Sequence, residues 1–142
     1  MTDHVARARV EIDAAPEVVW QWLTDPARIG RWMAGTEVST TWQVGSPITW
    51  RGEMNGTAYE DKGEVLAVDE PTLLSMTHYS PLMGGEDEPE NYHTVTYELS
   101  AAGNGTSVEL SQDGNESAEQ AEQFGATWQG MLDALKDTVE SG

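Results

Sequence analysis

The chain has 142 residues and no cysteine, and its 25 acidic and seven basic residues give a formal net charge of −18. This length suits one domain over residues 1–142, and the lack of cysteine excludes disulfides and thiolate metal sites. The charge disfavours nucleic acid and anionic membranes as partners. No stretch approaches the ~18 apolar residues of a membrane span, and no signal-peptide core is present, so we expect a cytoplasmic protein.

The acidic residues are spread along the chain, and only Lys62 and Lys136 are lysines. Distributed acidity with scarce lysine suits adaptation to high salt, because counterions then screen the self-repulsion that opposes compaction. An unchanged thermal stability between dilute buffer and molar KCl would contradict this hypothesis.

The first segment, Val5 to Met33, predicts a strand followed by two short helices, each opened by a proline. Pro16 suits the first position of the first helix, where its missing N–H is not needed. Asp25 suits the N-cap of the second helix, with Pro26 behind it and an end at Trp32.

The middle of the chain predicts an antiparallel meander of about six further strands. The weakest pattern covers 36–42, and the stronger runs cover 47–54, 58–69, 73–79, 92–100 and 107–112. Hairpin turns are expected at Asn55-Gly56 and at Asn104-Gly105. If the strands on either side of the 80–90 loop pair symmetrically, His78 and His93 lie opposite each other on the concave face.

The tail predicts one long helix of about 24 residues, with an apolar stripe that includes Phe124, Trp128 and Leu135. Such a helix is marginal alone, so its stripe should pack on the meander. Gly125 and Gly130 lower its propensity by roughly 1 kcal/mol each relative to alanine. Close approach to the sheet or a slight bend would explain both glycines.

This order of elements resembles the helix-grip fold of the START-like (SRPBCC) superfamily, and most closely the single-domain proteins like the activator of heat-shock protein 90 ATPase homologue. The resemblance covers nearly the whole chain and rests on short motifs: Ala15 to Trp20, Leu23 to Pro26 with Trp32, Gly52-Glu53, Gly63 to Val65, Thr94 to Leu99, Gly105-Thr106 and Trp128. It implies an α+β fold in which a curved antiparallel sheet of about seven strands grips the C-terminal helix, with an apolar cavity between them. It implies no single activity.

Bulky rings and flexible methionines are the side chains expected to line such a cavity. The candidates for its wall are Trp32, Trp50, Met54, Met76, His78, His93, Tyr97, Phe124, Trp128 and Met131. The alternative is that these residues simply fill the core.

The two histidines are the most informative polar residues in this set. Either they orient a ligand or move a proton, or they are hydrogen-bonded within the sheet. No third ligand stands at a recognisable spacing, so we expect neither a metal nor a cofactor. Carboxylate pairs such as Glu60-Asp61 are too frequent in this chain for any one of them to indicate acid–base chemistry.

Three functions follow from these observations. The first is a binding protein for a small apolar or aromatic molecule, acting as a monomer or homodimer. The second is a cyclase-like or dehydratase-like enzyme on the same scaffold, with His78, His93 or Tyr97 as acid–base groups. The third, implied by the resemblance, is a co-chaperone that activates the heat-shock protein 90 ATPase; those co-chaperones carry an additional amino-terminal domain, for which this chain has no room. We expect binding without catalysis.

Overall fold

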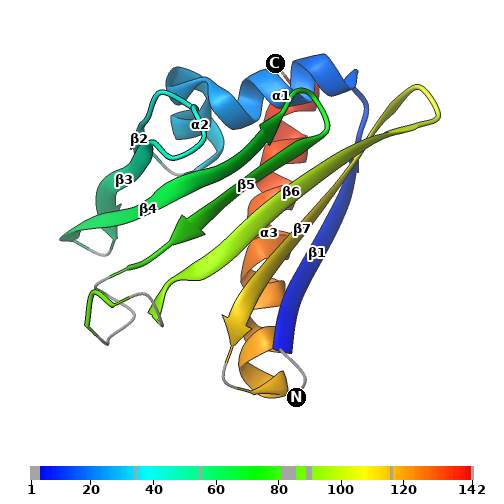
Figure 1. Ribbon diagram of the computed structural model, residues 1–142. Coiled ribbons are helices and arrows are strands. Elements are labelled where there is room, and N and C mark those ends of the chain that lie inside the picture. Colours follow the sequence, from blue (N-terminus) through cyan, green and yellow to red (C-terminus); the bar gives the residue numbers. More distant parts are fainter. Residues whose placement is uncertain are drawn as a thin grey trace.

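The computed structural model describes residues 4–33, 35–54, 56–80, 86–88, 91–115 and 117–141, with the backbone alone at Met54. Strands make up one sheet, and three helices accompany it (Figure 1). The elements are β1 (His4–Ile12), α1 (Pro16–Thr24), α2 (Pro26–Trp32), β2 (Glu37–Ser39), β3 (Pro47–Met54), β4 (Thr57–Asp69), β5 (Leu73–His78), β6 (His93–Ala102), β7 (Gly105–Asn115) and α3 (Ala118–Ser141).

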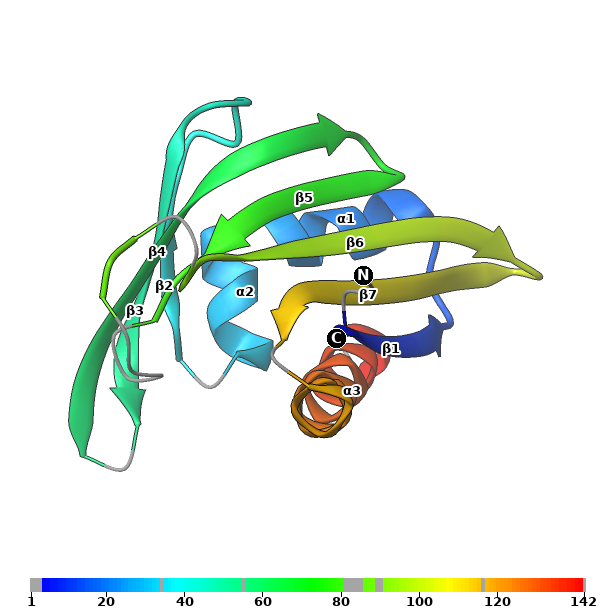
Figure 2. The same ribbon diagram turned by 60° about the horizontal axis from the view of Figure 1, so that its bottom comes forward.

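The sheet has seven antiparallel strands in the order β1-β7-β6-β5-β4-β3-β2. Figure 2, viewed nearly along α3, shows this helix beside the β1–β7 end of the curved sheet, with α2 between α3 and the β2–β4 end. The helix-grip architecture that was predicted is therefore confirmed.

The two short helices begin where the prolines indicate. Pro16 opens α1, and Asp25 is the N-cap of α2, where its Oδ1 accepts a hydrogen bond from the backbone N–H of Ala27 at 3.1 Å. The helix α2 ends at Trp32, whose indole Nε1 donates to the Trp22 carbonyl at 2.8 Å. This hydrogen bond ties the second helix to the first.

The strand register confirms the predicted pairing of His78 with His93 and corrects one turn. In the β6–β7 hairpin Ala102 pairs with Gly105, so the two loop residues are Gly103 and Asn104 rather than Asn104-Gly105. The chain needs a positive φ at the first loop position, and Gly103 supplies it with φ 59°. In the β3–β4 hairpin Gly56 has φ 81°, while Asn55 lies outside the described residues.

The sheet bends along β4, where glycine allows two strands to approach closely. A Cβ on Gly63 would lie 1.8 Å from the carbonyl oxygen of Thr77, so no other residue fits there without a shift of the backbone. Two residues further on, the register against β5 shifts between Val65 and Ala67, which marks a bulge. The bend gives the sheet the concave face that the helices cover.

The edge strand β1 is covered by side chains of α3. Gln129 accepts a hydrogen bond from the Arg9 N–H at 3.1 Å and donates to the Arg9 carbonyl at 2.8 Å. About two helical turns further along α3, Lys136 Nζ donates to the carbonyl of Glu11 at 2.7 Å. These contacts satisfy backbone groups that an edge strand otherwise leaves open to another chain.

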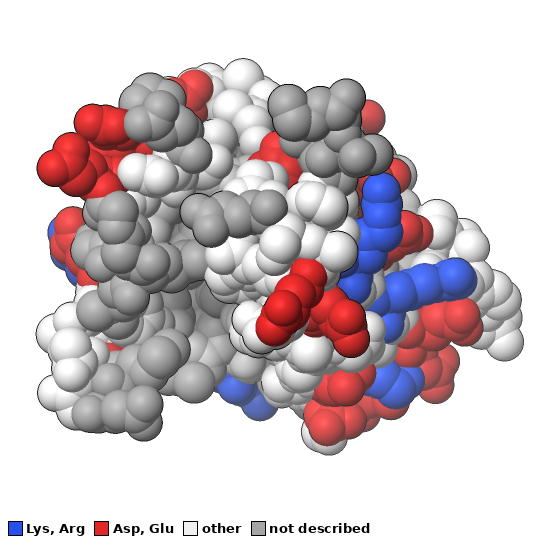
Figure 3. Space-filling model, turned by 90° about the horizontal axis from the view of Figure 1, so that it is seen from below, with Lys and Arg blue, Asp and Glu red and all other residues white. Residues whose placement is uncertain are grey.

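Charged side chains lie on every side of the face in Figure 3, and the acidic ones predominate, with most of the visible Lys and Arg on the right of the view. Most of the basic residues form ion pairs with neighbours, such as Arg51 with Glu60 at 2.7 Å and Lys136 with Glu140 at 2.7 Å. Most of the 25 acidic residues cannot be balanced in this way by seven basic ones. The predicted salt dependence stays a prediction.

Candidate functional site

A cavity of about 860 Å³ lies between the concave face of the sheet, α2 and the middle of α3, from Phe124 to Ala134. Its wall is mainly apolar and aromatic and draws on helices and strands from the whole chain. The lining residues are Leu23, Ile29, Trp32, Met33, Thr36, Trp42, Trp50, Glu53, Tyr59, Asp61, Leu74, Met76, His78, Ser80, Val95, Tyr97, Gln112, Phe124, Thr127, Trp128, Gly130, Met131 and Ala134.

Eight of the ten predicted wall residues line this cavity: Trp32, Trp50, Met76, His78, Tyr97, Phe124, Trp128 and Met131. His93 does not belong to the wall. Its Nδ1 donates to the Asp113 carbonyl at 2.8 Å, and its ring lies against Phe124 with centroids 6.0 Å apart. The side chain of Met54 lies outside what the structure describes.

Different structural features explain the two glycines of α3, Gly125 and Gly130. A Cβ on Gly125 would lie 3.2 Å from the Arg7 carbonyl oxygen, so this glycine allows the helix to lie close to β1, as predicted. A Cβ on Gly130 would meet nothing within 4 Å, and Gly130 lines the cavity. Gly130 is also exposed, so it lies at the rim of the cavity, where a side chain would enter open space rather than a close contact.

Two aromatic residues bring polar atoms to the wall. Trp128 Nε1 donates to Oε1 of Gln112, a buried residue that also lines the cavity. Tyr97 is 7% exposed, and burial raises the pKa of its phenol above the ordinary value, so Tyr97 is neutral at physiological pH. The cavity thus has isolated polar groups within an apolar surface.

The most polar part of the wall is a pair that the sequence analysis passed over. Asp61 Oδ2 accepts a hydrogen bond from His78 Nε2 at 2.9 Å, and their side chains are only 14% and 20% exposed. The Trp50 ring meets the His78 ring edge-on, with centroids 5.0 Å apart. The alternation of β4 contained a signal for this pair. Asp61 lies on the same face as Tyr59, whereas Glu60, Lys62 and Glu64 lie on the opposite, more highly charged face.

Two further aromatic wall residues were also missed. Tyr59 lies across its cross-strand partner Gly52, and a Cβ on Gly52 would come within 2.6 Å of the Tyr59 phenol oxygen. The Tyr59 hydroxyl is 2.7 Å from Thr36 Oγ1. Trp42 has φ 61°, a left-handed conformation that is uncommon outside glycine and Asn. Trp42 reaches the cavity from the end of the weakest predicted run, whereas Tyr59 lies at the start of a stronger one.

A cluster on the opposite face of the sheet attaches residues 86–88 to β4. Lys62 follows Asp61 and so points to the other side, where its Nζ forms an ion pair with Asp87, which also accepts a hydrogen bond from the Tyr92 hydroxyl. The hydrogen bond from Lys62 lowers the pKa of Asp87. Donation of a hydrogen bond to Asp87 raises the pKa of Lys62 and also that of Tyr92. The Tyr92 ring stacks on Tyr79 at 5.2 Å.

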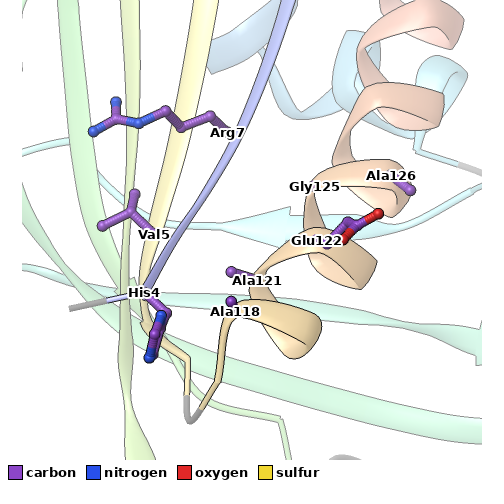
Figure 4. Close-up of a pocket in the computed structure, with 8 residues that line it drawn as sticks. All are labelled: His4, Val5, Arg7, Ala118, Ala121, Glu122, Gly125 and Ala126. Atoms are coloured by element: carbon purple, nitrogen blue, oxygen red, sulfur yellow. The ribbon is translucent and has the colours of Figure 1, made fainter. Parts of the chain in front are cut away.

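A second hollow, of about 590 Å³, lies between the start of β1 and the first turns of α3. Figure 4 shows Val5 and Arg7 extending from β1 away from the helix. On the helix side, alanines and Gly125 supply much of the lining. With few large apolar side chains on either wall, this hollow is a weaker candidate for a ligand site than the cavity.

Within the described ranges, no group of three or more His, Asp or Glu side chains could hold a metal ion. Among the helices of those ranges, none has the length and apolarity needed to cross a membrane.

The architecture and the position of the cavity define a helix-grip protein of the START-like superfamily. More specifically, the chain belongs to the family described as "Activator of Hsp90 ATPase homolog 1-like protein", which matches residues 13–140. This confirms the resemblance found in the sequence motifs.

Solved structures agree with this assignment. ChR145 from Cytophaga hutchinsonii is 42% identical, with a TM-score of 0.85 over 99% of this chain and 97% of that one. The Aha1 dimer from Colwellia psychrerythraea is 22% identical, with a TM-score of 0.74 over 99% and 97% of the two chains. Ara h 8.0201 is 15% identical, with a TM-score of 0.73 over 99% and 100%. The last two show the fold alone. No curated protein matches the chain significantly.

Proposed function

We propose that the protein binds a small apolar or aromatic molecule in the cavity between the sheet and α3. The observation that carries this proposal is the cavity itself, at about 860 Å³ within a wall of tryptophan, methionine, leucine and isoleucine side chains. Ligand sites typically occupy roughly 300–1,000 Å³, with apolar linings and a few polar groups. Eight sequence-predicted wall residues support the same proposal.

Gly130 offers a way to test binding without altering the polar groups of the wall. A side chain at this position would enter open space at the rim of the cavity, so Gly130→Leu should narrow the cavity. We expect the neutral fluorophore 1-aminoanthracene to bind the unaltered protein saturably, with enhanced emission. Its affinity for Gly130→Leu should fall by roughly two- to tenfold, about 0.4–1.4 kcal/mol, because a leucine at the rim obstructs part of the site.

Ala126→Leu is the matched control, because Ala126 is an exposed residue of the same helix that does not line the cavity. It should leave the affinity unchanged. Equal binding to all three proteins would place the probe outside the cavity, and no saturable binding to the unaltered protein would contradict the proposal. Since Ala126 lines the hollow beside β1, weaker binding in Ala126→Leu alone would identify that hollow as the site instead.

Native mass spectrometry of protein purified from its own cells gives an independent test. A reproducible small-molecule adduct supports binding, whereas a clean apo mass in several preparations favours a core without a ligand. The catalytic alternative retains His78 and Tyr97 at the cavity, while His93 lies outside it. A released molecule that changes chemically on incubation with fresh protein would favour catalysis.

A further inference from the structure

The Asp61 carboxylate determines which nitrogen of His78 carries a proton. A carboxylate only accepts hydrogen bonds, so the 2.9 Å contact requires a hydrogen on His78 Nε2. In the neutral ring the other nitrogen, Nδ1, then has a free lone pair and is an acceptor. Among the described residues, none forms a hydrogen bond with Nδ1. A ligand beside His78 therefore meets an acceptor that needs a donor.

The charges of the wall point to the same kind of ligand. Of the described lining residues, only Glu53 and Asp61 belong to the permanently charged types, and both are acidic. Asp61 Oδ1 is buried and has no hydrogen-bond partner within the described ranges, so no donor there offsets its share of the negative charge. An anionic ligand would enter without a lysine or arginine among these residues to receive it, in a chain of net charge −18.

The dimensions of the wall favour a flat ligand with its polar group at one end. On the shared face of β5 and β6, His78 and Tyr97 belong to cross-strand pairs four residues apart, which is roughly 13 Å along a strand. Between these pairs the facing residues are Met76 and Val95, which are apolar and buried. Trp50 also packs against His78 itself. An aromatic body can therefore lie on apolar side chains while its end group reaches His78.

We infer that the cavity selects a neutral aromatic molecule whose hydroxyl group donates a hydrogen bond to His78 Nδ1, and that it disfavours aromatic carboxylates. This inference rests on the proposed function and specifies its ligand class. Asp61 acts as a positioning residue that holds the accepting tautomer of His78, and its negative charge disfavours anions.

Three probes of similar size separate these effects: naphthalene, 2-naphthol and 2-naphthoate. Quenching of tryptophan emission or calorimetry measures each affinity at neutral pH. We expect the unaltered protein to bind 2-naphthol roughly two- to tenfold more tightly than naphthalene, the range of one net hydrogen bond. It should bind 2-naphthoate more weakly than naphthalene, because the carboxylate loses hydration without gaining a cationic partner.

Variants then test the two residues separately. His78→Phe should retain naphthalene binding and lose the preference for 2-naphthol. Asp61→Asn removes a negative charge and releases the tautomer, so it should reduce the 2-naphthol preference and increase the affinity for 2-naphthoate. A variant that merely damaged the wall would weaken all three probes. His93→Gln is the control for loss of a histidine outside the cavity, and should leave the three affinities unchanged.

The outcomes distinguish this inference from the function on which it rests. If none of the probes binds the unaltered protein, the proposed function fails. If all three bind it equally, or if 2-naphthoate binds most tightly, the cavity takes ligands and the inference about their chemistry is wrong. Unchanged preferences in His78→Phe would equally overturn the role of Nδ1.

Discussion

The two halves of α3 present the same apolar stripe to opposite situations. In the C-terminal half Leu132 and Leu135 are fully buried and Val139 nearly so, in one cluster with residues of β1, α1 and β7. In the N-terminal half Phe124 and Trp128 are only partly buried, and both line the cavity. One helix therefore closes a core at one end and leaves space at the other.

The chemistry of the side chains accounts for this difference. Branched aliphatic residues fill the closed end, where Leu132 and Leu135 have no exposed surface. At the open end the stripe consists of aromatic rings and methionine, and Gly130 adds no side chain where a Cβ would meet nothing within 4 Å. The filled core therefore lies against the C-terminal end of α3, whereas the cavity borders the middle of the helix.

The largest effect should come from shortening a side chain in the closed half. Leu135→Ala should lower the free energy of unfolding by roughly 2–5 kcal/mol, because it creates a void in a filled core. Met131→Ala, at the cavity wall, should lower it by clearly less, since that side chain already borders a cavity. Urea denaturation measures both. Equal losses would contradict the division of α3 into a closed and an open half.

The hydrogen bond within the open half should be the next largest contribution. Trp128→Phe leaves the buried side chain of Gln112 without its indole donor, which should cost about 1–3 kcal/mol. Because Gln112 lines the cavity, a water molecule can replace the donor, and we expect a loss near the lower end of this range. Thermal unfolding of the variant checks it; a loss as large as that of Leu135→Ala would show that this end is packed more tightly than proposed.

The two glycines of α3 allow a smaller effect of opposite sign. Gly130→Ala should raise the free energy of unfolding by up to about 1 kcal/mol, since alanine favours the helix and meets no neighbour. Gly125→Ala gains the same propensity, but its Cβ would lie 3.2 Å from a backbone oxygen of β1, so the gain should be offset. Equal stabilisation of both variants in urea denaturation would show that the helix does not lie tightly on β1.

The smallest effect concerns the cluster behind the cavity wall, and it depends on pH. The pKa of Asp87 is lowered, so its contribution to stability is complete above the ordinary carboxyl pKa and is lost as the pH falls through the lowered value. The pKa of Lys62 is raised, so its contribution is complete below the ordinary lysine pKa and is lost as the pH rises through the raised value.

NMR titration of the Asp87 carboxyl group can test this cluster directly. Its midpoint should lie below that of an unpaired aspartate and should move upward in Lys62→Gln, because the variant loses the largest cause of the lowered pKa. Arg51→Gln removes a basic residue from the neighbouring strand and serves as the control. A midpoint that does not respond to Lys62→Gln would show that Asp87 is not paired in solution.

Much of the fold was predictable because its signals are local. Asp25-Pro26 specifies a helix start through one cap and one fixed φ, and symmetric pairing around the 80–90 loop correctly placed His78 opposite His93. The β6–β7 turn was misplaced by one residue, since Gly103-Asn104-Gly105 contains two possible two-residue turns. The register of the whole hairpin, and not the dipeptide, decides between them.

The site was predictable in its apolar part and not in its polar part. Periodicity assigns Tyr97, Phe124 and Trp128 to faces that must meet, and all three line the cavity. His93 shares a sheet face with Tyr97, yet it is hydrogen-bonded to Asp113 and lies outside the wall. The opposite holds for Asp61, which was not predicted and yet lines the cavity. In the sequence it is one acid among many, and only its short distance to His78 distinguishes it.

The sequence by itself determined the order of elements, their apolar faces and membership of the family, because caps, turns and periodicity act over a few residues. Only the tertiary structure decided which part of the apolar face stays unfilled and which polar atoms border it. That depends on how far the sheet bends near Gly63 and on what lies opposite Gly130. Both are properties of segments far apart in the chain, and no local pattern encodes the distance between them.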